Sequence, residues 1–101
     1  MTKRELEDLI KNYIFTNNKV SRRNSLKSIR MHSLINWAAK ELLAEVRESN
    51  KEPEQVVEDF IRDMDIRSTY SLVTSEIFST AKTVGEDIMD SIIFYKERSS
   101  K

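Results

Sequence analysis

The sequence predicts an all-α protein, a compact four-helix bundle formed by a single domain over residues 1–101. The chain holds one glycine, Gly85, and one proline, Pro53, whereas β-rich folds need many such residues at hairpins and strand ends. Apolar residues recur at helical spacing in four separate segments. Hydrophobic residues make up 39% of the chain and charged residues 34%, a balance that suits a packed helical core with a charged surface.

The first helix is expected over about residues 3–15. Thr2 and Glu5 have the spacing of a capping box, in which each side chain accepts a hydrogen bond from the backbone N–H of the other. Apolar residues follow at helical period: Leu6, Leu9, Ile10, Tyr13 and Ile14. The polar stretch 16–24 predicts a connection, because adjacent asparagines favour turns.

The second helix is expected over about residues 25–48 and the third over about 53–66. The second has one apolar stripe: Met31, Ile35, Ala38, Ala39, Leu42 and Val46. The third begins at Pro53, because the first helical position needs no N–H donor. Its apolar face comprises Val56, Val57, Phe60, Ile61 and Met64.

The fourth helix, over about residues 69–96, carries two apolar rows. The main row is Tyr70, Val73, Ile77, Ala81, Val84, Ile88, Ile92 and Tyr95, and beside it lie Phe78, Gly85, Met89 and Ile93. Two rows predict either a central helix or a homodimer contact through the second row, the third alternative being a groove for a foreign helix. Glycine inside a helix costs about 1 kcal/mol relative to alanine. Gly85 therefore indicates either a close backbone approach or a tolerated kink.

Charge is segregated along a chain whose net charge is zero. Residues 1–40 hold nine basic and three acidic side chains, whereas residues 41–65 hold three basic and nine acidic ones. Such segregation either holds one helix against another or prepares a surface for a charged partner.

The candidate partner-binding surface combines Trp37 with cations on and before the second helix: Arg22, Arg23, Lys27, Arg30 and Lys40. Tryptophan and arginine dominate protein interfaces, and an indole among cations also stacks on unpaired bases. Zero net charge favours a protein partner. The alternatives are a nucleic-acid site at residues 19–30 with Trp37, and burial of Trp37 by another helix.

The residues do not form a recognisable catalytic set. The chain has no cysteine, and we expect its one histidine, His32, to be half-buried and structural. Two acidic clusters, Glu45-x-x-Glu48 and Glu86-Asp87-x-x-Asp90, weakly resemble the motifs with which all-α nucleotide pyrophosphohydrolases bind magnesium. The interval between the clusters is longer than in that family, and Asp87 replaces its leading glutamate. We therefore expect no enzyme, metal or cofactor, with a magnesium-dependent hydrolase as a distant alternative.

The localisation expected from the sequence is cytoplasmic. The first residues lack the apolar region of a secretory signal, and no stretch approaches the roughly 20 apolar residues of a membrane span. The absence of cysteine fits a reducing compartment. Together these features predict a small non-catalytic binding or regulatory protein that presents helix surfaces to a protein partner, with a homodimer as a further expectation.

Overall fold

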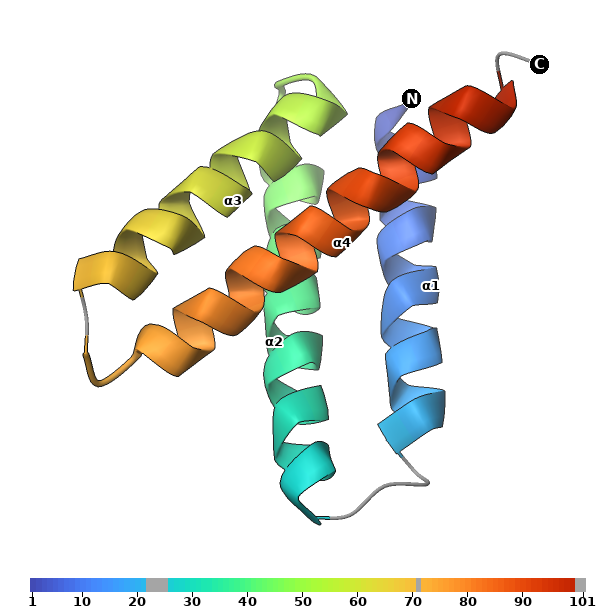
Figure 1. Ribbon diagram of the computed structural model, residues 1–101. Coiled ribbons are helices and arrows are strands. Elements are labelled where there is room, and N and C mark those ends of the chain that lie inside the picture. The colour runs from blue at the N-terminus through green and yellow to red at the C-terminus, as the bar shows by residue number, and fades with distance from the viewer. Residues whose placement is uncertain (22–25, 71, 100–101) are drawn as a thin grey trace.

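Helices account for nearly all of the described chain. The computed structural model describes residues 1–21, 26–70 and 72–99, and within these ranges it describes the side chains except at 20–29 and 99. The helices are α1 (Lys3–Ser21), α2 (Leu26–Glu48), α3 (Pro53–Tyr70) and α4 (Ser75–Ser99) (Figure 1). These described ranges contain no strand. The predicted all-α fold with four helices is confirmed.

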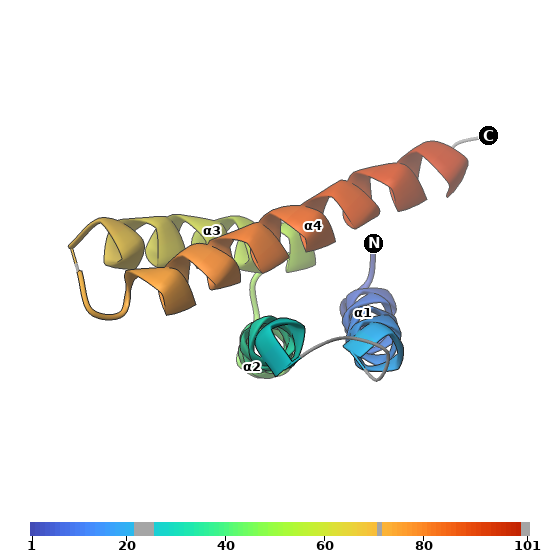
Figure 2. The same cartoon turned by 60° about the horizontal axis from the view of Figure 1, so that its bottom comes forward.

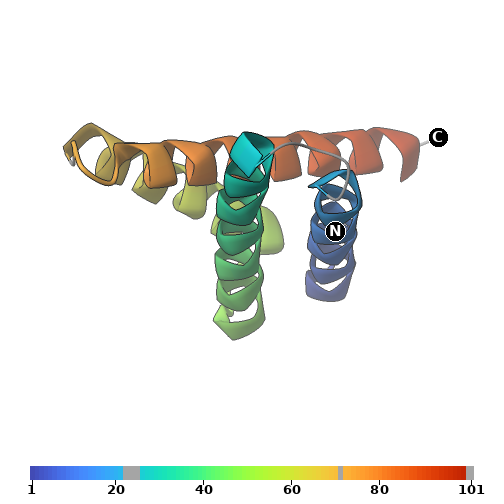
Figure 3. The ribbon, with the colours of Figure 1, turned by 90° about the horizontal axis from the view of Figure 1, so that it is seen from below.

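The helices form two antiparallel hairpins stacked in two layers. In Figure 2, where α1 and α2 are seen end-on, these two helices lie side by side and α3 and α4 form the layer above them. Helix α4 crosses both α2 and α1 (Figure 3) and packs on all three other helices. Within one chain, α4 therefore has the central position that was one of the alternatives for its two apolar rows.

The helix starts agree with the sequence signals. Thr2 and Glu5 form the predicted capping box, with distances from backbone N to side-chain oxygen of 3.0 and 3.1 Å. The hydrogen bond that the Thr2 backbone N–H donates to the Glu5 carboxylate is the main cause that lowers the pKa of Glu5. Pro53 is the first residue of α3. Lys3 also donates from Nζ to the carbonyl oxygens of Arg47 and Ser49, so that α1 caps the C-terminal end of α2.

Three predicted boundaries were wrong: the end of α1, the end of α3 and the start of α4. Helix α1 continues to Ser21 rather than ending near residue 15. Asn17 does not form a turn there, since its Nδ2 donates to the His32 carbonyl at 3.0 Å and to Asn36 Oδ1 at 2.7 Å, both on α2. A hydrogen-bonding partner on a neighbouring helix replaces the local backbone contact that would otherwise favour a turn.

The start of α4 was also predicted too early. Helix α3 runs on to Tyr70, with the Thr69 hydroxyl donating to the Asp65 carbonyl at 3.0 Å, and α4 begins only at Ser75. Tyr70 and Val73, which the sequence placed in the apolar row of α4, are 85% and 95% exposed. The apolar residues thus keep their helical spacing through the connection between α3 and α4, although Tyr70 and Val73 are not buried there.

The core is a single apolar cluster to which every helix contributes. Its members are Leu6, Ile10, Ala38, Ala39, Leu42, Leu43, Val46, Val56, Val57, Phe60, Met64, Ala81, Val84, Ile88 and Ile92. Most of the predicted stripes are therefore buried. Met31 is the exception in α2, with 44% of its surface exposed.

The second row of α4 contacts α3 at Gly85 and Phe78. Gly85 is buried, and a Cβ placed on it would lie 2.6 Å from Cγ1 of Ile61, so the predicted close approach is made by a helix of the same chain. Phe78 and Met89 are partly buried against the core. Only Ile93 of this row is open to solvent, with 49% of its surface exposed.

Candidate partner-binding groove

Trp37 is not buried by another helix, because 41% of its surface is exposed. It lies at the edge of a hollow of about 370 Å³ that is bounded by α2, α3 and the start of α4. The residues lining this hollow are Trp37, Glu41, Glu45, Phe60, Asp63, Met64, Arg67, Ile77 and Phe78. The structure therefore places the indole on a surface where a partner can reach it.

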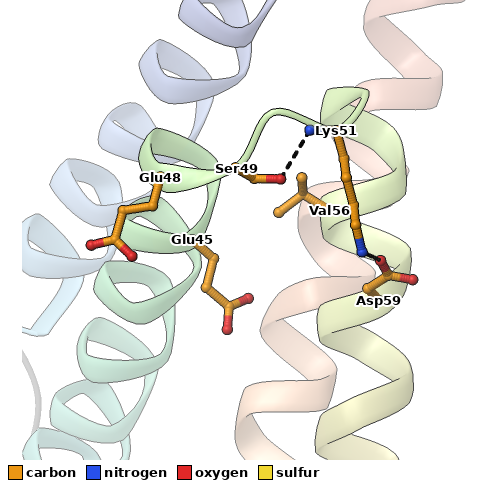
Figure 4. Close-up of a pocket in the computed structure, with 6 residues that line it drawn as sticks. All are labelled: Glu45, Glu48, Ser49, Lys51, Val56 and Asp59. Carbon is orange, nitrogen blue, oxygen red and sulfur yellow. Dashed lines mark hydrogen bonds and ion pairs between the residues drawn. The ribbon is translucent and has the colours of Figure 1, made fainter.

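A second hollow of about 270 Å³ lies nearer the α2–α3 connection (Figure 4). It is lined by Glu45, Glu48, Ser49, Lys51, Val56 and Asp59. Glu45 lines both hollows, so we treat them as one feature and call it the α2–α3 groove. Helices α2 and α3 diverge from their connection on either side of it (Figure 1).

The floor of the α2–α3 groove is apolar and its walls are acidic. Val56, Phe60 and Met64 of α3 belong to the core and also line the groove with apolar surface. Five carboxylates line the walls, namely Glu41, Glu45, Glu48, Asp59 and Asp63, against the two cations Lys51 and Arg67. An apolar floor between charged walls is the usual composition of a site that docks an amphipathic segment.

Both cations of the groove are already engaged by carboxylates of α3. Lys51 Nζ lies 3.0 Å from Asp59 Oδ2, and hydrogen bonds from Gln55 and Lys51 lower the pKa of Asp59. Arg67 Nε lies 3.3 Å from Asp63 Oδ2, and its guanidinium carbon lies 5.6 Å from the centre of the Phe78 ring. The aromatic surface of the groove thus already holds one cation of the chain itself.

The carboxylates of α2 have no such compensation. Within the part of the chain that the structure describes, neither Glu41 nor Glu45 makes an ion pair. Partial burial raises the pKa of Glu45, with the nearby carboxylates of Asp63 and Glu41 as further causes and Arg67 acting in the opposite sense. The wall formed by α2 therefore carries negative charge that, among the described side chains, Arg67 offsets only in part.

Of the cations predicted to surround Trp37, the two whose side chains are described, Arg30 and Lys40, do not line this groove. Arg22 and Arg23 lie outside the described residues, as does the side chain of Lys27. Arg30 is highly exposed and lies 4.0 Å from Glu76 of α4, and Lys40 is exposed. Sequence reasoning missed the acidic wall, although Glu41 and Glu45 follow Trp37 at intervals of four residues, the spacing of one helix face.

A separate apolar surface lies at the C-terminal end of α4. Ile93, Phe94 and Tyr95 are 49%, 58% and 39% exposed. Of the four residues predicted for a dimer contact, Ile93 alone belongs to this surface, because Phe78, Gly85 and Met89 pack within the chain.

The residues considered for chemistry lie apart. His32 is half-buried, as expected, and its Nδ1 lies 2.5 Å from Asn17 Oδ1, in a polar contact between α1 and α2. Glu45 and Glu48 lie on α2 at the groove. Asp87, from the second acidic cluster, instead accepts a 3.1 Å hydrogen bond from the Tyr13 hydroxyl. Across the described ranges, no three His, Cys, Asp or Glu side chains are grouped so as to hold a metal ion.

Comparison of the chain with protein-family models, with curated proteins and with solved structures finds no match. None of the helices within the described ranges combines the length and the hydropathy that crossing a membrane requires. The inference about function therefore depends on the α2–α3 groove and on the surface charge.

Proposed function

We propose that this protein is a non-catalytic binding or regulatory protein of the cytoplasm, and that it binds a partner protein in the α2–α3 groove. The observation that carries the proposal is Trp37, which is 41% exposed at the edge of a hollow with an apolar floor. Tryptophan is among the residues that contribute most to protein interfaces. A large exposed indole beside apolar surface marks a place where binding removes both from water.

The charges beside Trp37 favour a protein over a nucleic acid. Glu41, Glu45 and Asp63 line the same hollow as the indole, with Arg67 as the one cation. A nucleic acid whose base stacked on Trp37 would bring its phosphates towards these carboxylates. Nucleic-acid sites instead place Lys and Arg side chains beside the phosphates. The alternative, a nucleic-acid regulator using residues 19–30 with Trp37, rests on Lys19 and Arg30 and on residues 20–29, whose side chains lie outside the described part of the chain.

We further propose that two copies associate through the end of α4. Ile93 and Phe94 expose apolar surface there, and a twofold contact between identical surfaces is the commonest way in which soluble proteins pair. This contact lies away from the α2–α3 groove, whose lining residues end at Phe78 on α4. Dimer formation and partner binding are therefore separable.

Affinity capture from an extract of the native host tests the proposed function. The wild-type protein should retain a protein partner after nuclease treatment, and Trp37→Ala should lose it. Truncation of an interface tryptophan costs about 2 kcal/mol or more. Tyr70→Ala is the matched control, because Tyr70 is an exposed aromatic residue, 85% accessible, that does not line the groove.

The result also decides between the two kinds of partner. Capture that nuclease abolishes would favour the nucleic-acid alternative. Capture that survives Trp37→Ala but not an α4 substitution would refute the groove as the binding site. The free energy of unfolding of each variant, measured in urea, shows whether a loss of capture reflects a loss of fold.

A further inference from the structure

We infer that the partner enters the α2–α3 groove as a basic amphipathic helix, with an apolar stripe on the groove floor and Lys or Arg side chains against α2. The inference rests on the proposed function and specifies the chemistry of the partner at the same site. It combines the shape of the groove, the row of side chains on α2 and the charge that the chain leaves unpaired.

The shape of the groove suits a helix. Two helices, α2 and α3, form its walls, and Ile77 and Phe78 of α4 also line it. Along α2 the groove extends from Trp37 to Glu48, which at 1.5 Å per residue is about 16 Å, or three turns of a docked helix. Apolar side chains three and four residues apart on that helix would meet the floor at each turn.

The α2 wall presents a regular row of side chains. Trp37, Glu41 and Glu45 follow one another at intervals of four residues, so they lie along one face about one helical turn apart. Figure 4 shows the Glu45 side chain extending across the groove towards α3. A helix laid along this row would place an apolar residue against the indole, with cations one and two turns further on facing the two carboxylates.

The carboxylates of Glu41 and Glu45 in this row favour a partner that carries cations. Lys51 and Arg67 are already paired with Asp59 and Asp63. None of the side chains described for residues 1–40 forms an ion pair with Glu41 or Glu45, although that segment carries most of the basic residues. Among the described side chains, the carboxylates of Glu41 and Glu45 are therefore open to a complementary partner.

The direct probe is a synthetic peptide of 14 residues in which leucine and lysine alternate at helical period. Trp37 is the only tryptophan of the chain, so with a tryptophan-free peptide the indole emission reports on the groove alone. Two further peptides replace every lysine by glutamine or by glutamate. We expect the lysine peptide to shift the Trp37 emission to shorter wavelength and to bind about tenfold more tightly than the glutamine peptide, a difference of about 1.4 kcal/mol. The glutamate peptide should not bind.

Two matched variants test the row of carboxylates. Glu41→Gln/Glu45→Gln should weaken binding of the lysine peptide about tenfold, as expected when two charge contacts are lost. Glu58→Gln/Glu86→Gln changes the net charge equally at exposed positions that do not line the groove, and it should leave the affinity within about twofold of wild type. The difference between the variants should shrink in high salt, because screening weakens exposed charge pairs.

Several results would overturn the inference. Equal binding of the lysine and glutamine peptides would refute a cationic partner while leaving groove binding intact. Equal loss in the two variants would show a general charge effect. A shift of the emission with protein concentration alone, abolished by Glu41→Gln/Glu45→Gln, would identify a second copy as the occupant. Failure of the proposed function itself is seen separately, as capture that does not depend on Trp37.

Discussion

Gly85→Ala should destabilise the protein, although alanine is the better helix former. The added Cβ would lie 2.6 Å from Cγ1 of Ile61 and 3.2 Å from Cδ1 of Phe60, whereas carbon atoms in contact lie about 3.5–4.0 Å apart. Cγ1 is bonded directly to the Cβ of Ile61, so it moves away only if the side chain changes rotamer or α3 shifts. Helix α3 must therefore move, or its side chains must repack.

The expected magnitude is the difference between two opposing effects. Alanine gains about 0.8–1.0 kcal/mol over glycine in a helix interior, and forcing an extra methyl group into a packed contact costs about 1–3 kcal/mol. The net loss should be about 1 kcal/mol, which lowers the melting temperature of a domain of this size by about 4–8 °C.

Ile61→Ala provides the decisive background, because it removes the atom that the new Cβ would meet. In that background Gly85→Ala should be stabilising by up to about 1 kcal/mol, the gain in helix propensity, less the cost of the 3.2 Å approach to Cδ1 of Phe60 that remains. The coupling between the two positions is then up to about 2 kcal/mol, well above the few tenths expected for independent sites. Urea unfolding followed by far-ultraviolet circular dichroism measures all four members of the cycle.

Ser79→Ala is the control, since Ser79 is exposed in the same helix. It should give the same small change in both backgrounds. If Gly85→Ala stabilised the wild-type protein as much as the Ile61→Ala variant, the close approach of α3 and α4 would be refuted.

The remaining predictions concern charge, assembly and catalysis. Because the pKa of Glu45 is raised in the folded state, the protonated carboxyl favours folding and this contribution is lost as the pH rises through that pKa. Glu45→Gln should therefore raise the urea midpoint at about pH 7 but not at about pH 3, below the unfolded glutamate pKa of about 4.3; an equal gain at both would contradict this. Sedimentation equilibrium should return a dimer mass at micromolar concentration, reduced to the monomer by Ile93→Glu with no loss of helix, and a monomer at high concentration would exclude the dimer. The purified protein should not hydrolyse nucleoside triphosphates with magnesium or manganese, and turnover lost in Glu48→Gln would reverse that expectation.

The prediction for Glu45 also bears on the proposed partner. A carboxylate that opposes folding at neutral pH is better explained by binding than by stability, since natural proteins commonly retain unfavourable groups where function needs them. Glu45→Gln should accordingly stabilise the free protein while weakening its binding of the lysine peptide. A residue with a purely structural role would not separate these two effects.

The position of Phe78 changes how the dimer is tested. The sequence placed Phe78 in a row that was a candidate interface, which would have made Phe78→Glu the natural probe. In the structure Phe78 packs against the core with the Arg67 guanidinium over its ring, so a charge there would disturb the subunit itself. Ile93, which is 49% exposed, tests association with less effect on the fold.

The partner-binding site could be predicted from the sequence only in part. Trp37 was identified, but its neighbours were taken from the same helix and the basic segment before it, giving a surface rich in cations. Glu41 and Glu45 were available in the sequence at the correct spacing. Glu41 and Glu45 become part of a binding site only because Asp63 and Arg67 of α3 and Phe78 of α4 line the same hollow. These three residues lie too far from Trp37 along the chain for helical spacing to relate them to it.

The sequence by itself determined the elements that depend on local chemistry. The apolar period selected four helices and most of the core, and the Thr2–Glu5 capping box and Pro53 marked two helix starts, because the interactions concerned span at most a few residues. Tertiary structure alone decided that α1 continues through Asn17, whose hydrogen-bond partners lie on α2. It also decided that Gly85 meets Ile61 and that Asp63 lines the same hollow as Trp37, because these pairs join residues of different helices, whose relative placement no local period encodes.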